Sequence, residues 1–351
     1  MKRIILFFSI FATLSGTCSG CSDKDGDVKE ERQEEDTRSL KDAPYQMGCA
    51  VNVGLLRSNE QCRKLILKEM TSITPENAMK MEALSIGRGE YNWTDADYLV
   101  NFAMQNKMRI HGHTLLWHRA LPAWVSSFEG DREAWIDLMK NYISDVVGHF
   151  KGKLASWDVV NEALEDDGTY RNTVWYEHIG KEYLDLAFKF AHEADPNVLL
   201  FYNDYGMEYS KAKRDAICQM IKDMKLRNIP VDGIGIQMHI DMYRPKSDFI
   251  QAIQAAAACG VKVHVSELDV ATNPEKKSDI KYTVDVAERQ KQSYKNMSEA
   301  LQGIPVSQCY GLTVWGIRDS DSWLASSPDW PLLFDQNCAK KTSYYGLLES
   351  F

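Results

Sequence analysis

The sequence predicts a (β/α)8 barrel, a fold in which eight parallel strands alternate with the helices that cover them. The chain has 351 residues, 44% of them hydrophobic, which is enough for the core of one such domain. Amphipathic stretches with the period of a helix separate short apolar runs that are typical of buried strands. These runs end near residues 52, 74, 113, 160, 202, 237, 266 and 315.

An open, doubly wound sheet is the structural alternative. Such a sheet would favour a glycine-rich, phosphate-binding turn after the first strand. The corresponding stretch, AVNVGLLRSNEQ, contains only Gly54. The sequence also has no repeat with a period of 20–50 residues, which would indicate a solenoid or a propeller.

Caps and apolar stripes indicate individual helices between the strands. Ser58 and Gln61 have the spacing of a capping box ahead of the first helix. Asp131 can cap a later helix, and a third helix is expected from a cap at Ser247 to a stop at Gly260. The helix after Asp131 has one apolar stripe, formed by Trp135, Leu138, Met139, Tyr142, Ile143 and Val146.

Seven of the eight expected strands end in polar side chains. In a (β/α)8 barrel the carboxyl ends of all strands meet at one face, where active sites lie. An unpaired buried polar group costs roughly 1–3 kcal/mol, so seven polar sets at one face indicate a functional site. In chain order the sets are Glu76, Asn77 and Lys80; His113 and Trp117; Asn161 and Glu162; Asn203 and Asp204; Gln237 and His239; Glu267 and Asp269; and Trp315, Arg318, Asp319 and Trp323.

Two glutamates indicate the chemistry of this site, because Glu162 and Glu267 each end a strongly apolar strand. Glycoside hydrolysis needs such a pair: one carboxyl group protonates the leaving oxygen, and the other attacks the sugar or activates water. The amide, Lys and indole groups around them suit a polyhydroxylated ligand. Strands four and seven lie three places apart, which gives a separation of roughly 6 Å between the carboxyl groups. That value lies between the retaining and inverting ranges and does not choose between them.

These strand ends resemble the motifs of glycoside hydrolase family 10, the endo-β-1,4-xylanases. The resemblance covers about residues 43–351 and includes seven motifs in order: TPENAMK, HGHTLLWH, WDVVNEAL, NDYGME, DGIGIQMH, VHVSELDV and VWGIRDSDSW. It implies a retaining hydrolase of xylan and xylo-oligosaccharides that needs no cofactor. Ala120 is a departure, because the family often has Gln there, and it leaves the subsite preference open.

The resemblance implies a role for each catalytic residue. Glu267 would be the nucleophile that forms a covalent xylosyl-enzyme. Glu162 would be the general acid and then the base that activates the second water molecule. Asn161 would hold the 2-hydroxyl of the reacting sugar, a contact that strengthens toward the transition state. The pKa of Glu162 should be raised, because this carboxyl group must stay protonated until it acts.

Other residues at the strand ends would support the glutamates or bind sugar. His239 would orient Glu267 and favour its ionised form, with Asp269 behind that pair. Asn203 would support the catalytic pair, and Tyr205 would stack on the leaving-group side. The remaining substrate-binding residues implied by the resemblance are Glu76, Asn77, Lys80, His113, Trp117, Gln237, Trp315 and Trp323.

Two other functions remain open at this point. One is a retaining barrel hydrolase that cleaves another β-glucan with the same two glutamates. The other is a lipoprotein that binds glycans without cleaving them. No metal is expected: His111 and His113 form a His-x-His pair, but the other strand ends lack further ligands of the kind a Zn or Fe site needs.

The overall charge and the cysteines restrict the partners. The formal net charge of −9 argues against a nucleic-acid partner, and a monomer is expected. Six cysteines lie beyond the N-terminal region, and their wide spacing excludes a compact zinc module. Six cysteines allow 15 pairings, so no pairing is predicted.

The N-terminal region predicts export. Lys2 and Arg3 precede a short apolar run, and Cys18-Ser19-Gly20-Cys21 follows it. We expect residues 1–20 to be a lipoprotein-type signal peptide with Cys21 as the lipidated residue, or an ordinary secretory signal as the alternative. Residues 21–42 are mostly charged and are expected to be a flexible tether to a catalytic domain at 43–351. The lipid would be the only contact with the membrane of the cell envelope.

Overall fold

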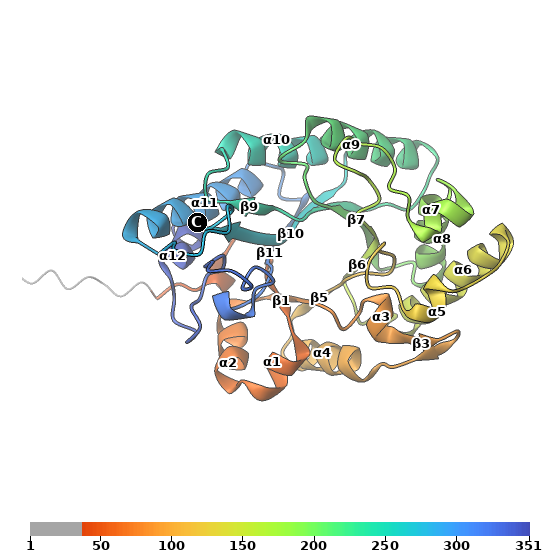
Figure 1. Cartoon of the computed structure of the whole chain (residues 1–351), viewed down its shortest axis with the longest axis horizontal. Coiled ribbons are helices and arrows are strands. Elements are labelled where there is room, and N and C mark those ends of the chain that lie inside the picture. The colour runs from red at the N-terminus through yellow and green to blue at the C-terminus, as the bar shows by residue number, and fades with distance from the viewer. Residues whose placement is uncertain (1–36) are drawn as a thin grey trace, which may run out of the picture. The chain divides into compact units, whose positions relative to one another are not determined.

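The computed structural model describes residues 37–351, in which eight parallel strands close into a barrel (Figure 1). The strand order is β11-β1-β2-β5-β6-β7-β8-β10, and β11 also pairs with β10, which closes the ring. The predicted (β/α)8 fold is therefore confirmed. The barrel strands are β1 (Met47–Val51), β2 (Ser72–Pro75), β5 (Arg109–Gly112), β6 (Ser156–Asn161), β7 (Leu199–Asp204), β8 (Gly233–Ile236), β10 (Lys262–Ala271) and β11 (Cys309–Val314).

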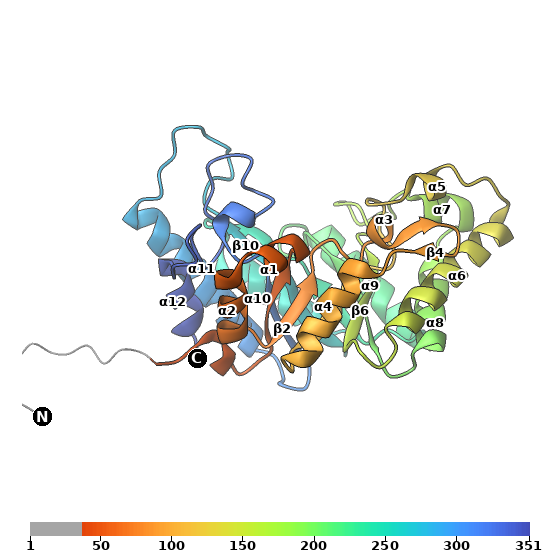
Figure 2. The same ribbon diagram turned by 90° about the horizontal axis from the view of Figure 1, so that it is seen from below.

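Helices cover the outside of the barrel, as Figures 1 and 2 show. The helices are α1 (Val53–Ser58), α2 (Glu60–Glu69), α3 (Met81–Leu84), α4 (Thr94–Gln105), α5 (Ala123–Ser126), α6 (Arg132–His149), α7 (Val174–Ile179), α8 (Tyr183–Ala194), α9 (Lys211–Leu226), α10 (Lys246–Ala257), α11 (Val284–Gln302) and α12 (Thr342–Leu348). The small elements are η1 (Leu40–Asp42), β3 (Ser85–Gly87), β4 (Glu90–Tyr91), β9 (His239–Asp241) and η2 (Asp319–Asp321). Within residues 37–351 no helix has the length and apolar character needed to cross a membrane.

The helix starts agree only in part with the sequence analysis. The Asp131 carboxylate caps α6 by accepting a hydrogen bond from the backbone NH of Ala134 at 2.9 Å, as predicted. The capping box at Ser58 is wrong, because Ser58 ends α1 and Asn59 caps α2. The predicted cap at Ser247 is also wrong: α10 already begins at residue 246, after Pro245. Asparagine and serine suit the capping position about equally, and Asn59 is the residue whose side-chain oxygen accepts from the backbone NH of Cys62, at 2.9 Å. Helix α10 has no side-chain cap.

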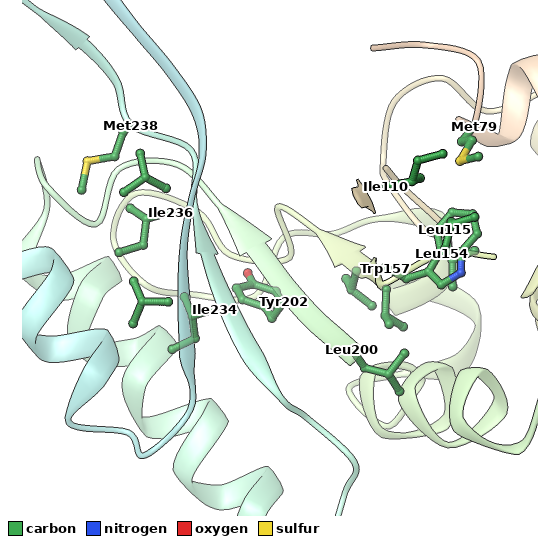
Figure 3. Close-up of a cluster of buried hydrophobic side chains, with 14 of the residues drawn as sticks. Met79, Ile110, Leu115, Leu154, Trp157, Leu200, Tyr202, Ile234, Ile236 and Met238 are labelled. Carbon is green, nitrogen blue, oxygen red and sulfur yellow. The ribbon is translucent and has the colours of Figure 1, made fainter. Parts of the chain in front are cut away.

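The hydrophobic core fills the space between the strands and the surrounding helices. Figure 3 shows part of it, with Trp157 and Leu200 from neighbouring strands near Ile110 and Leu154. Gly112 makes room for this packing, since a Cβ atom there would lie 2.3 Å from the Trp157 ring. Strands fixed in this way hold their carboxyl ends at constant positions on one face.

Packing of the domain begins within the segment that was expected to be a tether. Leu40 is fully buried, and its backbone NH donates to Glu69 Oε2 at 3.0 Å. The Tyr344 hydroxyl donates to the same oxygen at 2.8 Å. The segment around Leu40, helix α2 and helix α12 therefore meet at the Glu69 carboxylate. Cys21 and the predicted signal peptide lie outside the described residues.

Candidate active site

A cleft of about 500 Å³ lies at the carboxyl ends of the barrel strands. The segments after β2 and β5 and the loop after β11 rise on this face of the barrel (Figure 2). Thirteen of the residues that the sequence analysis named line the cleft: Glu76, Asn77, Lys80, His113, Trp117, Asn161, Glu162, Tyr205, Gln237, His239, Glu267, Trp315 and Trp323. Asn203 and Asp269, which were expected to support them, are buried and hydrogen-bonded to Glu267 and His239 respectively.

The two glutamates divide the rim of the barrel into two arcs. Glu162 follows β6 and Glu267 lies on β10, with β7 and β8 between them on one side. The other arc contains β5, β2, β1 and β11. It carries most of the expected sugar-binding side chains, from Glu76 to Trp117 and from Trp315 to Trp323. The shorter arc carries Tyr205, which was expected to stack on the leaving-group side.

Glu162 has an unusual backbone conformation. Its φ angle is +58°, in the left-handed region that residues other than glycine rarely adopt. Tertiary contacts hold it there: its NH donates to Asn203 O at 2.9 Å, and Arg171 Nε donates to Glu162 O at 3.1 Å. Gln237 Nε2 then donates to the side-chain atom Oε1 at 3.0 Å. Strain of this kind persists only where the surroundings fix the residue, as they do at active sites.

Glu267 is buried and held by two donors. Asn203 Nδ2 donates to Oε1 at 2.7 Å, and His239 Nε2 lies 3.2 Å from Oε2. Burial raises the pKa of this carboxyl group, but the hydrogen bond from His239 and the electrostatic influence of the nearby His113 and His239 imidazoles outweigh burial, so the pKa is lowered overall. Glu267 is therefore an ionised carboxylate at neutral pH, as a nucleophile must be.

His239 lies between two carboxylates. Its Nδ1 is 2.8 Å from Asp269 Oδ2, and its Nε2 faces Glu267. Burial opposes a positive charge on the ring, but Asp269 and Glu267 outweigh it and raise the His239 pKa well above its ordinary value. Trp323 Nε1 donates to the same Asp269 oxygen at 2.7 Å, so this carboxylate also holds a wall of the cleft.

Three amides connect the glutamates. Asn203 must direct its NH2 group to the Glu267 carboxylate, because its oxygen accepts from Ser266 Oγ at 2.6 Å. The same NH2 group donates to Asn161 Oδ1 at 2.9 Å, and Gln237 Nε2 donates to that oxygen at 3.2 Å. These bonds use one atom of the Asn161 amide, and the other atom, 3.3 Å from Trp117 Nε1, is left for a sugar hydroxyl. Close packing requires Gly235 here, since a Cβ atom would lie 2.2 Å from the Asn203 oxygen.

The two histidines of the His-x-His pair have separate places. His113 lines the cleft, whereas His111 is buried in the barrel. Both contact Asp158 Oδ2, at 2.9 Å and 3.0 Å respectively. Burial would raise the Asp158 pKa, but the two histidines lower it far below its usual range. Within residues 37–351 no group of three or more His, Cys, Asp or Glu is arranged to hold a metal ion.

Two lysine ammonium groups lie over aromatic rings that line the cleft. Lys80 Nζ lies 4.9 Å from the centre of the Trp117 ring and donates to Asn77 Oδ1 at 2.9 Å. On the other arc, the buried Lys213 ammonium lies 3.3 Å from the centre of the Tyr205 ring. Lys213 also pairs with Asp204 at 2.9 Å. Asp204 therefore holds Lys213 in place against Tyr205 on the shorter arc.

The sequence analysis did not name five side chains that line the cleft: His118, Arg119, Arg171, Glu208 and Tyr209. His118 Nδ1 lies 3.8 Å from Glu162 Oε2, and burial lowers the His118 pKa to about 4 despite that carboxylate. Arg171 also lines the cleft and donates to the Tyr205 hydroxyl at 2.9 Å. Glu208 is 3% exposed, and burial raises its pKa to about 7. His118 follows Trp117 and Glu208 belongs to NDYGME, so adjacency to the motifs was the available signal.

This fold and this site define a glycoside hydrolase: a (β/α)8 barrel with two buried glutamates among amide, imidazole and indole side chains at the strand ends. The model of glycosyl hydrolase family 10 matches residues 37–350. The chain belongs to that family.

Characterised relatives and solved structures agree with this assignment. A β-1,4-xylanase from Dictyoglomus thermophilum is 37% identical over 341 residues, which cover 92% of this chain and 94% of the relative. Endo-1,4-β-xylanase B from Thermotoga neapolitana is 34% identical, with 85% of each chain covered. The crystal structure of xylanase 10B from Thermotoga maritima has a TM-score of 0.82 and 36% identity, and covers 88% of this chain and 94% of that chain.

Proposed function

We propose that this chain is an endo-1,4-β-xylanase that hydrolyses internal bonds of xylan with retention of configuration. The observation that carries the proposal is the pair of different environments around the two glutamates. Glu267 is held ionised by the cationic His239, whereas Glu162 faces a neutral amide and the neutral His118. One carboxylate ready to attack and one carboxyl group free to carry a proton are what double displacement requires.

In the first step Glu267 Oε attacks the anomeric carbon and the bond to the leaving sugar breaks. Glu162 transfers its proton to the departing oxygen, so a neutral hydroxyl leaves. The Asn161 amide forms a hydrogen bond with the 2-hydroxyl of the reacting sugar, where charge develops in the transition state. The product is an ester between Glu267 and xylose.

In the second step water replaces the leaving group. Glu162, now a carboxylate, takes one proton from the water, and the resulting oxygen attacks the anomeric carbon. The ester bond breaks and Glu267 becomes a carboxylate again, which the charge on His239 favours. Two inversions give net retention.

The lining of the cleft and the ligands of relatives support xylan as the substrate. The longer arc presents carboxylate, amide and ammonium groups for hydroxyls together with indole rings that frame a pyranose. Xylanase 10C from Cellvibrio japonicus was solved as a mutant with xylopentaose, at a TM-score of 0.84 and 33% identity. Mutants of a xylanase from Thermoanaerobacterium saccharolyticum were solved with xylotetraose and with xylotriose.

A second candidate is a hydrolase of another β-glucan, for which one relative provides a specific reason. The protein named exoglucanase XynX from Acetivibrio thermocellus is 33% identical over 317 residues. As a β-glucan hydrolase, this chain would use Glu162 and Glu267 in the same roles. Products from xylan, cellulose and mixed-linkage glucan, compared at equal enzyme concentration, distinguish the two substrates.

The test of the mechanism uses the purified protein with Glu267→Ala and Glu162→Ala. We expect xylo-oligosaccharides from the wild type, and a loss of activity of at least about 1000-fold in both variants on xylan.

NMR during early turnover should show the β-anomer of the product first. Azide should restore turnover of an activated aryl xyloside by Glu162→Ala, because azide needs no general base. An α-anomer formed first would exclude retention. If the folded wild type binds xylan without cleaving it, the chain is instead a glycan-binding protein.

We also propose that the chain is exported and acylated at Cys21. The charged start, the apolar run and the small residues before Cys21 support this. Incorporation of labelled palmitate into the wild type and its loss in Cys21→Ser is the expected result. Secretion of an unlabelled protein would support an ordinary secretory signal instead.

A further inference from the structure

Two cysteines that are far apart in the sequence meet in the structure. The sulfur atoms of Cys62 and Cys338 lie 3.5 Å apart, although 276 positions separate the two residues. Cys62 belongs to α2 and is fully buried. Cys338 lies in the turn before α12 and is partly exposed. Both are thiols in the structure.

The turn that carries Cys338 is held against α2. The Asp335 carboxylate accepts hydrogen bonds from the backbone NH groups of Asn337 and Ala339, each at 2.8 Å. Gln61, next to Cys62 in α2, donates through Nε2 to the carbonyl oxygen of Asn337 at 2.8 Å. These bonds fix the turn on both sides of Cys338, so the contact between the two sulfur atoms follows from the backbone geometry.

We propose that Cys62 and Cys338 form a disulfide when the protein reaches an oxidising compartment. A disulfide needs a sulfur–sulfur distance of about 2.05 Å, so the two atoms must approach by about 1.5 Å. Rotation of the partly exposed Cys338 side chain supplies this movement. The proposal goes beyond the glycosidase reaction and does not depend on it.

The reaction is a thiol–disulfide exchange with an oxidant that itself contains a disulfide. The Cys338 thiolate attacks that disulfide, forms a mixed disulfide and releases one thiolate of the oxidant. The Cys62 thiolate then attacks the Cys338 sulfur, closes the intramolecular bond and releases the second thiolate. The two cysteines lose two protons and two electrons, and the oxidant is reduced to two thiols. Cys338 reacts first because Cys62 is buried, which raises the Cys62 pKa to about 12.

The disulfide would fasten the last loop of the barrel to its first long helix. Arg318 donates to the carbonyl oxygen of Gln336, in the turn before Cys338, at 3.2 Å. Its guanidinium also pairs with both Asp321 oxygens, at 2.6 Å and 2.7 Å. This segment leads to Trp323, which already bonds to Asp269 without the disulfide. We therefore expect the disulfide to stabilise the fold and to leave the cleft unchanged.

The experiment uses the purified full chain, treated with either oxidised glutathione or a strong dithiol reductant. Free thiols are then alkylated under denaturing conditions and the protein is digested after Lys and Arg. In the oxidised sample we expect the peptides 58–63 and 319–340 to be joined. We expect the melting temperature to be higher in the oxidised sample by about 5 °C, and kcat/KM on xylo-oligosaccharides to be equal in both.

Cys338→Ser is the matched variant, because its partly exposed side chain tolerates a hydroxyl group better than the buried site does. It should lose both the cross-link and the redox dependence of the melting temperature. Cys218 and Cys259 also lie together, since both thiols donate to the carbonyl oxygen of Ala255, at 3.5 Å and 3.3 Å, so a cross-link between these two cysteines is followed separately. Full alkylation of Cys62 and Cys338 in the oxidised sample would overturn the proposal, as would a cross-link from Cys62 to any other cysteine.

Discussion

At the scale of single residues, the charge on His239 decides how Glu267 behaves. A buried carboxyl group tends to hold its proton, and here a histidine cation reverses that tendency. The cation in turn exists because Asp269 accepts from its other ring nitrogen. Asp269, His239 and Glu267 thus form a chain in which each charge depends on the next, and Asp269 affects the proposed nucleophile, Glu267, through His239.

Replacing Asp269 with Asn should therefore change the pH dependence of the reaction. The amide keeps an acceptor for His239 and Trp323 but removes the negative charge, so the His239 pKa falls and the Glu267 pKa rises. Glu267 is the group that must be ionised, so the acid limb of the kcat/KM profile should move to higher pH. A charge-assisted hydrogen bond of ~1.5–3 kcal/mol between Asp269 and His239 corresponds to a shift of the His239 pKa by roughly one to two units, which is the upper limit for the shift of the acid limb.

Trp323→Phe is the control for this variant, because it removes only the indole donor to Asp269. It should alter KM and leave the acid limb in place. An unchanged profile in Asp269→Asn would contradict the dependence of Glu267 on Asp269 and would mean that Asp269 acts only by holding Trp323.

At the scale of elements, the helices and strands differ in whether neighbouring residues or distant contacts determine where they begin and end. The start of α6 at Asp131 follows from one carboxylate and the backbone NH of Ala134, three residues later. The end of β6 does not, because the left-handed Glu162 is held by Asn203 from β7 and by Arg171 from the following loop. A cap can therefore be predicted from a short stretch of sequence, whereas the backbone geometry of Glu162, the proposed acid/base residue, depends on its neighbours in space.

The cap makes a simple test of the local argument. Asp131→Ala should lower the free energy of unfolding by about 1 kcal/mol, since an NH group at the first turn loses its acceptor. Asp131→Asn should cost much less, because the amide oxygen still accepts that bond. Chemical denaturation of the three proteins provides the values. A loss of equal size in both variants would indicate that the charge near the helix start matters more than the hydrogen bond.

At the scale of the whole molecule, the start and the end of the described chain are joined through α2. Leu40 and Tyr344 both bond to the buried Glu69, and Lys340 Nζ lies 3.5 Å from its second oxygen. The residues just before the barrel thus belong to its packing. The model of the family, which matches from residue 37, agrees with this.

A chain that begins at residue 43 should consequently be less stable than one that begins at residue 37. The shorter chain loses the fully buried Leu40 side chain, worth about 1.5–3 kcal/mol, and removes one donor to Glu69. Melting temperatures of the two proteins provide the measurement, with Leu40→Ala in the longer chain as the matched control. Equal melting temperatures for all three would show that this segment does not contribute to the fold.

The sequence by itself determined the barrel, the strand ends and the position of both glutamates in the cleft. These features depend on the alternation of apolar runs with amphipathic stretches and on polar residues at the ends of the runs, all of which are visible over short distances along the chain. Only β10 departs clearly, since pairing with β9 extends it to Ala271. The positions of Glu162 and Glu267 three strands apart follow directly from that order.

The tertiary structure alone decided which distant side chains meet. The left-handed backbone of Glu162, the place of His118 beside it, the contact of Cys62 with Cys338 and the bond from Leu40 to Glu69 all join residues from different elements. No periodicity records such contacts, because each depends on how the strands and helices pack around one another. The charge of a buried group has the same origin: Glu267 and Glu208 are both buried glutamates, and only their neighbours in space give them opposite pKa shifts.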